Sequence, residues 1–391
     1  MTVTGRDRRR PNDQNPSRKG IRGGAALLLA ATLFLGGCSG NTNSSGPAAP
    51  LPTGQTGSIE ATSNTGNCYI SDASACSSAT YTGAHPITAL ATLVSGSTNY
   101  LYLGDSAGDI SYATVATTTP PTPSSCTSSL NTKVLALAAN STALLYATSG
   151  GIAYISSPAS CSSTSTSTSI SNTITNTSGL TYNTVASKFV GVTSNAQYFT
   201  CSTSTNSCTS PQTLPSLQDA SPSITAIASD PTLSIVYILS IGASTNRIYF
   251  YYVNGNTLTY LGNYSGLELN YPSGVALFQG YYPSQNYCQT GPCTFMDVTN
   301  TGNSTITQYV VTYSGSGPST SVSVNQFNNA YFDCDLIDSA AIASFPNYGS
   351  GNLLPTPDVF VGEQGTSTAP CMGISSGTFG NNVTAYSVVG E

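Results

Sequence analysis

The feature that most constrains the fold is a short motif of alternating large and small apolar residues that recurs along the chain. Its clearest copy is Ile-Thr-Ala-Leu-Ala at residues 87–91. The six copies are centred on Ala89, Ala136, Thr181, Ala226, Ala276 and Ala341. Most copies lie about 45 residues apart, and a period of this size indicates repeated supersecondary units.

Two further strand-like runs follow each copy, such as residues 100–104 and 109–112 after the first. They are rich in β-branched and aromatic residues and are separated by Gly, Ser, Thr and Asn, a pattern typical of strands rather than helices. Three or four strands per repeat predict an all-β protein, a β-propeller with six blades. We expect residues 59–84 to add an outer strand to the last blade and to close the ring. A β-helix or a pair of β-sandwiches is the alternative fold.

The blade pattern resembles that of NHL-type and lactonase-like six-bladed propellers. Leu-Tyr-Leu-Gly-Asp at residues 101–105, a turn, and Asp-Ile-Ser-Tyr at 109–112 carry this resemblance, which extends over most of residues 85–391. The third copy departs from it, with Thr181 where the others have Ala. Lactonase-like propellers use a bound metal, so the resemblance implies a Ca²⁺-assisted hydrolase as an alternative function.

The first residues are typical of an export signal. Residues 1–22 are polar and basic, residues 25–35 form an apolar run, and Gly36-Gly37-Cys38 follows. This order indicates a signal peptide, and the run is shorter than the ~20 residues of a membrane span. Residues 35–38 (Leu-Gly-Gly-Cys) resemble the lipobox of bacterial lipoproteins, whose cysteine is lipidated; an ordinary signal peptide with a chance cysteine is the alternative.

The resemblance divides the chain into three parts. Residues 1–37 would be a lipoprotein signal peptide, and residues 38–58, with a lipidated Cys38, a flexible tether rich in Gly, Ser and Pro. Residues 59–391 would be the propeller domain. The protein would then be extracytoplasmic and attached to a bacterial membrane by its lipid. Where the envelope has two membranes, Ser39 favours the outer one, by analogy with the lipoprotein family.

The charge distribution limits the kinds of partner. Only 7% of the 391 residues are charged, and seven of the ten basic residues lie within residues 1–22. After residue 37 the chain keeps Lys133, Lys188 and Arg247 against fourteen acidic residues. Such a surface cannot neutralise phosphates, so nucleic-acid binding is excluded. The single histidine, His85, excludes zinc sites built from several histidines.

The eleven cysteines fit an exported protein. With Cys38 assigned to lipid attachment, an even number remains, which predicts disulfides outside the cytoplasm. We expect the pairs Cys68–Cys76, Cys126–Cys161, Cys201–Cys208, Cys288–Cys293 and Cys334–Cys371. Sequence alone leaves the connectivity open. No Cys-x-x-Cys motif occurs, which argues against metal or redox chemistry.

Most of the scarce carboxylates map to one face of the predicted ring. The loops between blades and the turns between second and third strands should open on the same face. These segments contain His85, Asp105, Asp109, Asp219, Tyr271, Asp297, Asp333, Asp335, Asp338 and Glu363. Clustered carboxylates bind hard cations such as Ca²⁺, and the metal ligands would be Asp105, Asp109, Asp333, Asp335 and Asp338. The plainer interpretation is that Asp is a common turn former.

The remaining residues favour binding over catalysis. His85 is the only imidazole base, and no Gly-x-Ser-x-Gly motif accompanies it. We expect Tyr281 and Tyr282, in a loop bounded by cysteines, to be exposed, and His85 and Tyr271 to join them as binding residues. The sequence thus predicts a lipid-anchored module that binds a protein or glycan. A Ca²⁺-dependent hydrolase or lyase, and a structural or adhesive surface protein that uses residues 280–293, are the alternatives.

Overall fold

A computed structural model describes most of the chain beyond the first tens of residues. The described residues are 58–63, 66–69, 81–82, 85–115, 123–127, 130–280, 293–302, 305–326, 331–332, 339–345, 359–363 and 382–389. All belong to one of the two compact units of the chain, Cys38–Glu391, the other being Met1–Gly37. Within this described part, no helix has the length and apolar character needed to cross a membrane.

Five blades are each built from one continuous stretch of chain. In each blade, four strands consecutive in sequence lie side by side in an antiparallel sheet. Blades 1 and 2 contain β4 (Ile87–Ser95), β5 (Thr98–Asp105), β6 (Ile110–Val115), β7 (Ser124–Thr127), β8 (Ala136–Ala139), β9 (Ala143–Thr148), β10 (Gly151–Ser156) and β11 (Ser167–Ser171). Blade 3 contains β12 (Thr177–Asn183), β13 (Lys188–Thr193), β14 (Gln197–Ser202), β15 (Ser207–Cys208) and β16 (Gln212–Thr213).

Blades 4 and 5 are the most regular part of the fold, with strands of up to ten residues. They contain β17 (Ser223–Ser229), β18 (Ile235–Ile241), β19 (Arg247–Asn254), β20 (Thr257–Tyr264), β21 (Pro272–Gly280), β22 (Cys293–Asn300), β23 (Thr305–Ser314), β24 (Ser321–Gln326) and β25 (Tyr331–Phe332). Apolar side chains from the facing sheets of these two blades fill a common core.

The prediction of an all-β propeller is confirmed, but the number of blades differs. The structure has five blades of the predicted kind, not six, because the sixth repeat does not supply a complete blade from one stretch of chain. Its strands belong instead to a sheet that we call the terminal sheet: β26 (Ser339–Ser344), β27 (Val359–Glu363), β28 (Asn382–Val389), β1 (Ser58–Ser63), β2 (Gly66–Tyr69) and β3 (Tyr81–Thr82). In this sheet β28 pairs with both β1 and β3.

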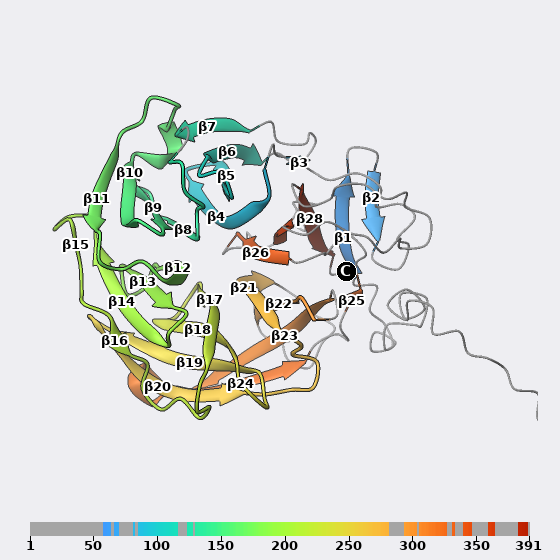
Figure 1. The fold of residues 1–391 in the computed structure, drawn as a ribbon. Coiled ribbons are helices and arrows are strands. Elements are labelled where there is room, and N and C mark those ends of the chain that lie inside the picture. The colour runs from blue at the N-terminus through green and yellow to red at the C-terminus, as the bar shows by residue number, and fades with distance from the viewer. Residues whose placement is uncertain are drawn as a thin grey trace, which may run out of the picture. The chain divides into compact units, whose positions relative to one another are not determined.

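The innermost strands follow one another around a central channel. β4 contacts β8, and the contacts continue through β12, β17, β21 and β26 back to β4. Figure 1 shows these strands turned toward the centre of the ring, with the later strands of each blade outside them. All six copies of the sequence motif lie on these innermost strands, so the repeat correctly located them.

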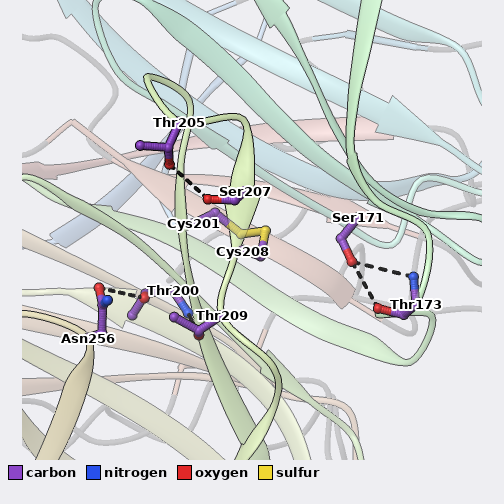
Figure 2. The surroundings of a disulfide bond; sticks show 9 residues. All are labelled: Ser171, Thr173, Thr200, Cys201, Thr205, Ser207, Cys208, Thr209 and Asn256. Atoms are coloured by element: carbon purple, nitrogen blue, oxygen red, sulfur yellow. Dashed lines mark hydrogen bonds between the residues drawn. A yellow bond between two sulfur atoms is a disulfide. The ribbon is translucent and has the colours of Figure 1, made fainter.

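Two of the predicted disulfides are present. Cys126 is bonded to Cys161, which joins β7 of blade 1 to the connection between β10 and β11 of blade 2. Cys201 is bonded to Cys208 across the β14–β15 hairpin, as Figure 2 shows. Cys293 is also disulfide-bonded. The side chains of Cys68, Cys76, Cys288, Cys334 and Cys371 lie outside those that the structure describes, so the other pairings stay predictions.

Candidate functional site

The channel is shaped first by an irregularity shared by the innermost strands. Five of them shift register by one residue near their first end, and the extra residue is Thr88, Ser178, Thr225, Ser273 or Ala340. Such bulges change the direction of one side chain and take that residue out of the pairing between strands. The Thr88 hydroxyl donates to the Val134 carbonyl at 2.5 Å, and the Thr225 hydroxyl donates to the Pro272 carbonyl at 2.8 Å. Bulged threonines therefore bind the next blade at equivalent positions.

The small residue after each bulge is required by the neighbouring blade. A Cβ atom on Gly179 would lie 2.9 Å from both the backbone N and the Cγ2 of Ile227, and one on Gly274 would lie 2.8 Å from the Cγ2 of Ile342. Since each glycine directly follows a bulge, Gly179 and Gly274 occupy the position of Ala89. The sequence alignment, which placed Thr181 and Ala276 there, was therefore wrong by two residues in these copies.

A large aliphatic residue follows each small one and divides the channel in two. These residues are Leu90, Leu137, Leu180, Ile227, Val275 and Ile342, and each of them borders both cavities of the channel. We call this set the aliphatic ring. On the bulged side of the ring the cavity is only about 60 Å³. On the other side it is about 510 Å³, within the range of small-molecule sites.

The larger cavity, which we call the chamber, opens where the first and second strands of each blade are joined. Its walls carry apolar groups and hydroxyls, including Thr92, Ser141, Thr181, Ser229 and Ser344. Among the described residues of its walls the one charged residue is Asp230, which is only 1% exposed. Asp230 Oδ1 accepts bonds from the backbone N and Oγ1 of Thr232 and from the backbone N of Leu233, and Oδ2 accepts bonds from the hydroxyls of Tyr237 and Tyr313.

The opposite end of the ring is the one to which sequence analysis assigned the functional residues. There the loops between blades and the turns between second and third strands are hydrogen-bonded to each other: Ser106 N donates to Pro86 O, and Thr301 N donates to Tyr271 O. We call this end the inter-blade face. The prediction that these two kinds of segment share one face is therefore confirmed.

Asp105 forms a backbone turn on the inter-blade face. Its Oδ1 accepts hydrogen bonds from the backbone N–H groups of Ala107, Gly108 and Asp109, each at 2.9 Å. No three His, Cys, Asp or Glu side chains of the described chain lie close enough to share a metal ion. Of the other predicted ligands, Asp109 lies at the end of the same turn, whereas Asp333, Asp335 and Asp338 lie outside the described residues, so the Ca²⁺ site stays a prediction.

The remaining predicted residues are distributed around the ring. His85 is exposed, beside blade 1, whereas Tyr271 is 57% exposed, beside blade 5. Tyr281 and Tyr282 lie outside the described residues. They fall in the sequence between β21 and β22, the first and second strands of blade 5.

Asp297 does not lie in a turn, as its sequence position suggested. It lies within β22 and is completely buried, because the strand continues to Asn300 before the chain turns. Its Oδ1 accepts a hydrogen bond from Gln308 Nε2 at 2.9 Å, and its Oδ2 has no partner. Burial raises the pKa of Asp297 to about 7, and the bond from Gln308 opposes this shift.

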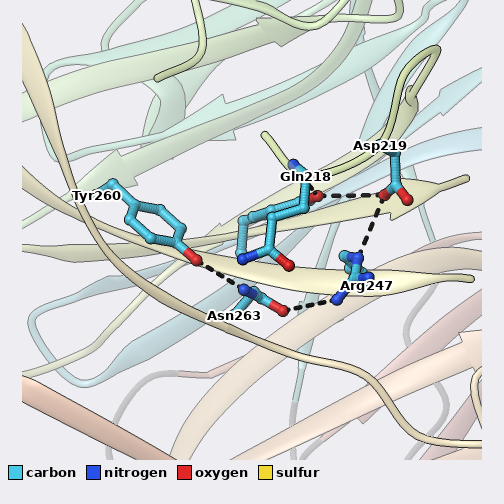
Figure 3. Close-up of polar contacts among 6 residues, drawn as sticks. Gln218, Asp219, Arg247, Tyr260 and Asn263 are labelled. Carbon is cyan, nitrogen blue, oxygen red and sulfur yellow. Dashed lines mark hydrogen bonds and ion pairs between the residues drawn. The ribbon is translucent and has the colours of Figure 1, made fainter. Parts of the chain in front are cut away.

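A polar cluster stabilises the inter-blade face between blades 3 and 4. Arg247 Nε lies 3.4 Å from Asp219 Oδ2, and Arg247 also donates to Asn263 Oδ1 at 3.0 Å. Figure 3 shows these contacts and the bond from Asn263 to the Tyr260 hydroxyl. The Tyr249 hydroxyl donates to Asp219 as well, at 3.2 Å. One of the three cations after residue 37 is thus engaged in holding the Asp219 loop.

The loop between blades 4 and 5, residues 266–271, which we call the anchor loop, contains the predicted binding residue Tyr271, but the sequence analysis did not identify Leu267 beside it. Leu267 in this loop is fully exposed, and Tyr271 is among the few other large apolar residues on the described surface. Tyr271 has a φ of 51°, a conformation uncommon for residues other than glycine. Gly302 leaves room for the Tyr271 side chain, since a Cβ there would lie 2.8 Å from the ring.

Hydrogen bonds hold the anchor loop at several points. Glu268 Oε1 accepts bonds from the hydroxyls of Tyr264 at 2.7 Å and Tyr309 at 3.1 Å. The backbone of the loop is bonded as well, because Asn270 N donates to Asn300 Oδ1 and Asn246 Nδ2 donates to Leu269 O. The two exposed side chains therefore project from a well-fixed backbone.

Comparison with known proteins assigns no function to the chain. No protein-family model matches the chain, and a search of curated proteins finds no similar sequence. Among solved structures the chain is similar to the β-propeller domain of Cps50 (Swd1) from Myceliophteria thermophila, with 9% sequence identity and a TM-score of 0.43. The similarity covers 78% of this chain and 83% of that one. The functional assignment consequently depends on the residues described above.

Proposed function

We propose that the protein is a lipid-anchored binding module of the bacterial cell envelope, which uses the anchor loop to hold a protein ligand. The observation that carries this proposal is the exposure of Leu267 and Tyr271 on a backbone fixed by hydrogen bonds. Exposed apolar and tyrosine side chains are typical contact residues of protein interfaces. A loop that is already ordered loses little entropy on binding.

Photo-crosslinking in intact cells tests this proposal directly. A photoreactive residue at position 267 should give one dominant protein adduct, and the same residue at position 185 should not. Val185 is a suitable control because it is 52% exposed and lies in the turn between β12 and β13, at the chamber end. Leu267→Ser should reduce recovery of the partner at least tenfold. An adduct that forms equally at both positions, or binding to a glycan without any protein adduct, would refute the proposed protein ligand.

The lipid anchor is tested separately from ligand binding. The apolar run at 25–35 and the Leu-Gly-Gly-Cys sequence at 35–38 support it. Cells fed an alkyne-labelled fatty acid should label the wild-type protein, and Cys38→Ser should lose the label and move to the soluble fraction. A labelled Cys38→Ser protein, or a wild-type protein that fractionates as soluble, would exclude the anchor at Cys38.

The proposal also includes a closing role for the terminal sheet as a sixth blade completed by β1 and β2. Hydroxyl bonds on β26 support it: Thr92 Oγ1 donates to Ser344 O at 2.6 Å, and Ser344 Oγ donates to Leu277 O at 2.8 Å. Glu60 is the register partner of Ser387, so cysteines placed at these two positions should form a disulfide under oxidation. Failure of this cross-link in the folded protein would refute the closure.

A further inference from the structure

We infer that the chamber is a second binding site, independent of the anchor loop, for an uncharged, largely apolar small molecule that carries a hydroxyl or carbonyl group. The first argument is its shape. The chamber has a volume of about 510 Å³, and the aliphatic ring separates it from the cavity of about 60 Å³ beyond. A ligand that enters from the open end therefore meets an apolar floor.

The second argument is the distribution of charge. None of the described residues that border the chamber is Lys, Arg or His, so a carboxylate or phosphate would lose its hydration there without gaining a counter-ion. Asp230 is the one acid there, and hydrogen bonds to both carboxylate oxygens and 1% exposure leave it unable to bind a cation directly. The chamber thus favours a neutral ligand over either ion.

The third argument is the supply of polar groups for orientation. Within the described part of the chain, Ser141, Tyr182 and Thr184 border the chamber, and their hydroxyls make no hydrogen bond to another described residue. Other hydroxyls are already used, since Thr181 Oγ1 donates to Ser229 Oγ at 3.0 Å. A few free hydroxyls on an otherwise apolar wall are typical of sites that orient a small molecule through one or two polar atoms.

Displacement of a neutral fluorescent dye tests the inference. The full chain carrying Cys38→Ser is purified without detergent and titrated with N-phenyl-1-naphthylamine. Three competitors with ten-carbon chains, 1-decanol, decanoate and decylammonium, are then added separately. We expect saturable binding of the dye at one site. We expect 1-decanol to displace it at least tenfold more effectively than decanoate or decylammonium. Absence of saturable binding, or displacement by either ion as effective as that by the alcohol, would overturn the inference.

Matched substitutions locate the site. Ala139 is partly exposed at the chamber wall, so Ala139→Phe should fill the chamber and weaken dye binding at least tenfold. Ala107→Phe is the control, because Ala107 is equally half-buried but lies in the β5–β6 turn of the inter-blade face. Thr184→Phe, at an exposed position of the chamber wall, gives a second blocking variant should Ala139→Phe fail to fold.

Three outcomes distinguish this inference from the proposed protein ligand. Leu267→Ser should bind the dye as the parent does, because the anchor loop lies at the other end of the ring. Loss of dye binding in Leu267→Ser, or unchanged binding in both Ala139→Phe and Thr184→Phe, would overturn the chamber site. If no protein adduct forms at position 267 but the dye still binds, the proposed protein ligand is refuted and the chamber site is supported.

Discussion

Replacement of Asp297 by Asn should remove a pH dependence of stability that one buried carboxylate creates. Burial raises the pKa of Asp297 from 3.8 to about 7 in the folded protein. Between these two values the folded chain keeps a proton that the unfolded chain has lost, so the free energy of unfolding falls as the pH rises through this window. Each pKa unit corresponds to about 1.4 kcal/mol, and the full difference is therefore about 4 kcal/mol above pH 7.

Asn at position 297 cannot ionise and can still accept the bond from Gln308. The wild type and Asp297→Asn should thus have similar stabilities at pH 4, and the variant should become the more stable one, by up to about 4 kcal/mol at pH 8. Urea unfolding followed by tyrosine fluorescence measures this, since the chain has 24 Tyr and no Trp. Asp109→Asn, at a turn rather than in the core, is the control. Parallel urea midpoints for wild type and Asp297→Asn from pH 4 to 8 would refute the reasoning.

Three further variants test how neighbouring blades are held together. Gly179→Ala should lower the free energy of unfolding by about 1–3 kcal/mol, because its Cβ would lie 2.9 Å from Ile227; an unchanged urea midpoint would refute the close approach. The double variant Cys126→Ser/Cys161→Ser opens a loop of 35 residues and should lose about 4 kcal/mol, a loss that non-reducing thermal melts would detect and that a reductant should reproduce in the wild type. Thr225→Val should cost about 1 kcal/mol in urea unfolding, and no cost would mean that its bond to the next blade contributes nothing.

The innermost strands could be predicted from the sequence because their pattern has a local cause. A small residue followed by a large aliphatic one recurs wherever one blade packs against the next, as Ala89 and Leu90 do. The alignment failed only where Gly took the place of Ala, at positions 179 and 274, because the match did not treat Gly as equivalent to Ala. Bulges insert one residue, and a motif count has no means of detecting them.

The site itself was less predictable. Asp297 follows a strand-like run, and the sequence does not show where the strand ends, so a buried acid was placed in a turn. The width of the channel depends on how six side chains meet from strands far apart in the sequence, and a pattern within one repeat contains no such information. The anchor loop had two detectable signals: Tyr271 was predicted to be a binding residue, and Leu267 stands apart from the apolar alternation of the neighbouring strands.

The connections between blades also explain how the fold is stable with so few charged residues. The described ties between innermost strands are hydroxyl bonds: Thr88 and Thr225 donate to a carbonyl of the next blade, and Thr181 donates to Ser229. A short hydroxyl side chain loses less conformational entropy on ordering than Lys or Glu, and a neutral bond is not weakened by salt as an ion pair between exposed charges is. A ring closed in this way needs charge only at a few loops, such as that of Asp219 and Arg247. The abundant Ser and Thr residues thus join neighbouring blades as well as forming turns. The free energy of unfolding should therefore change little with ionic strength.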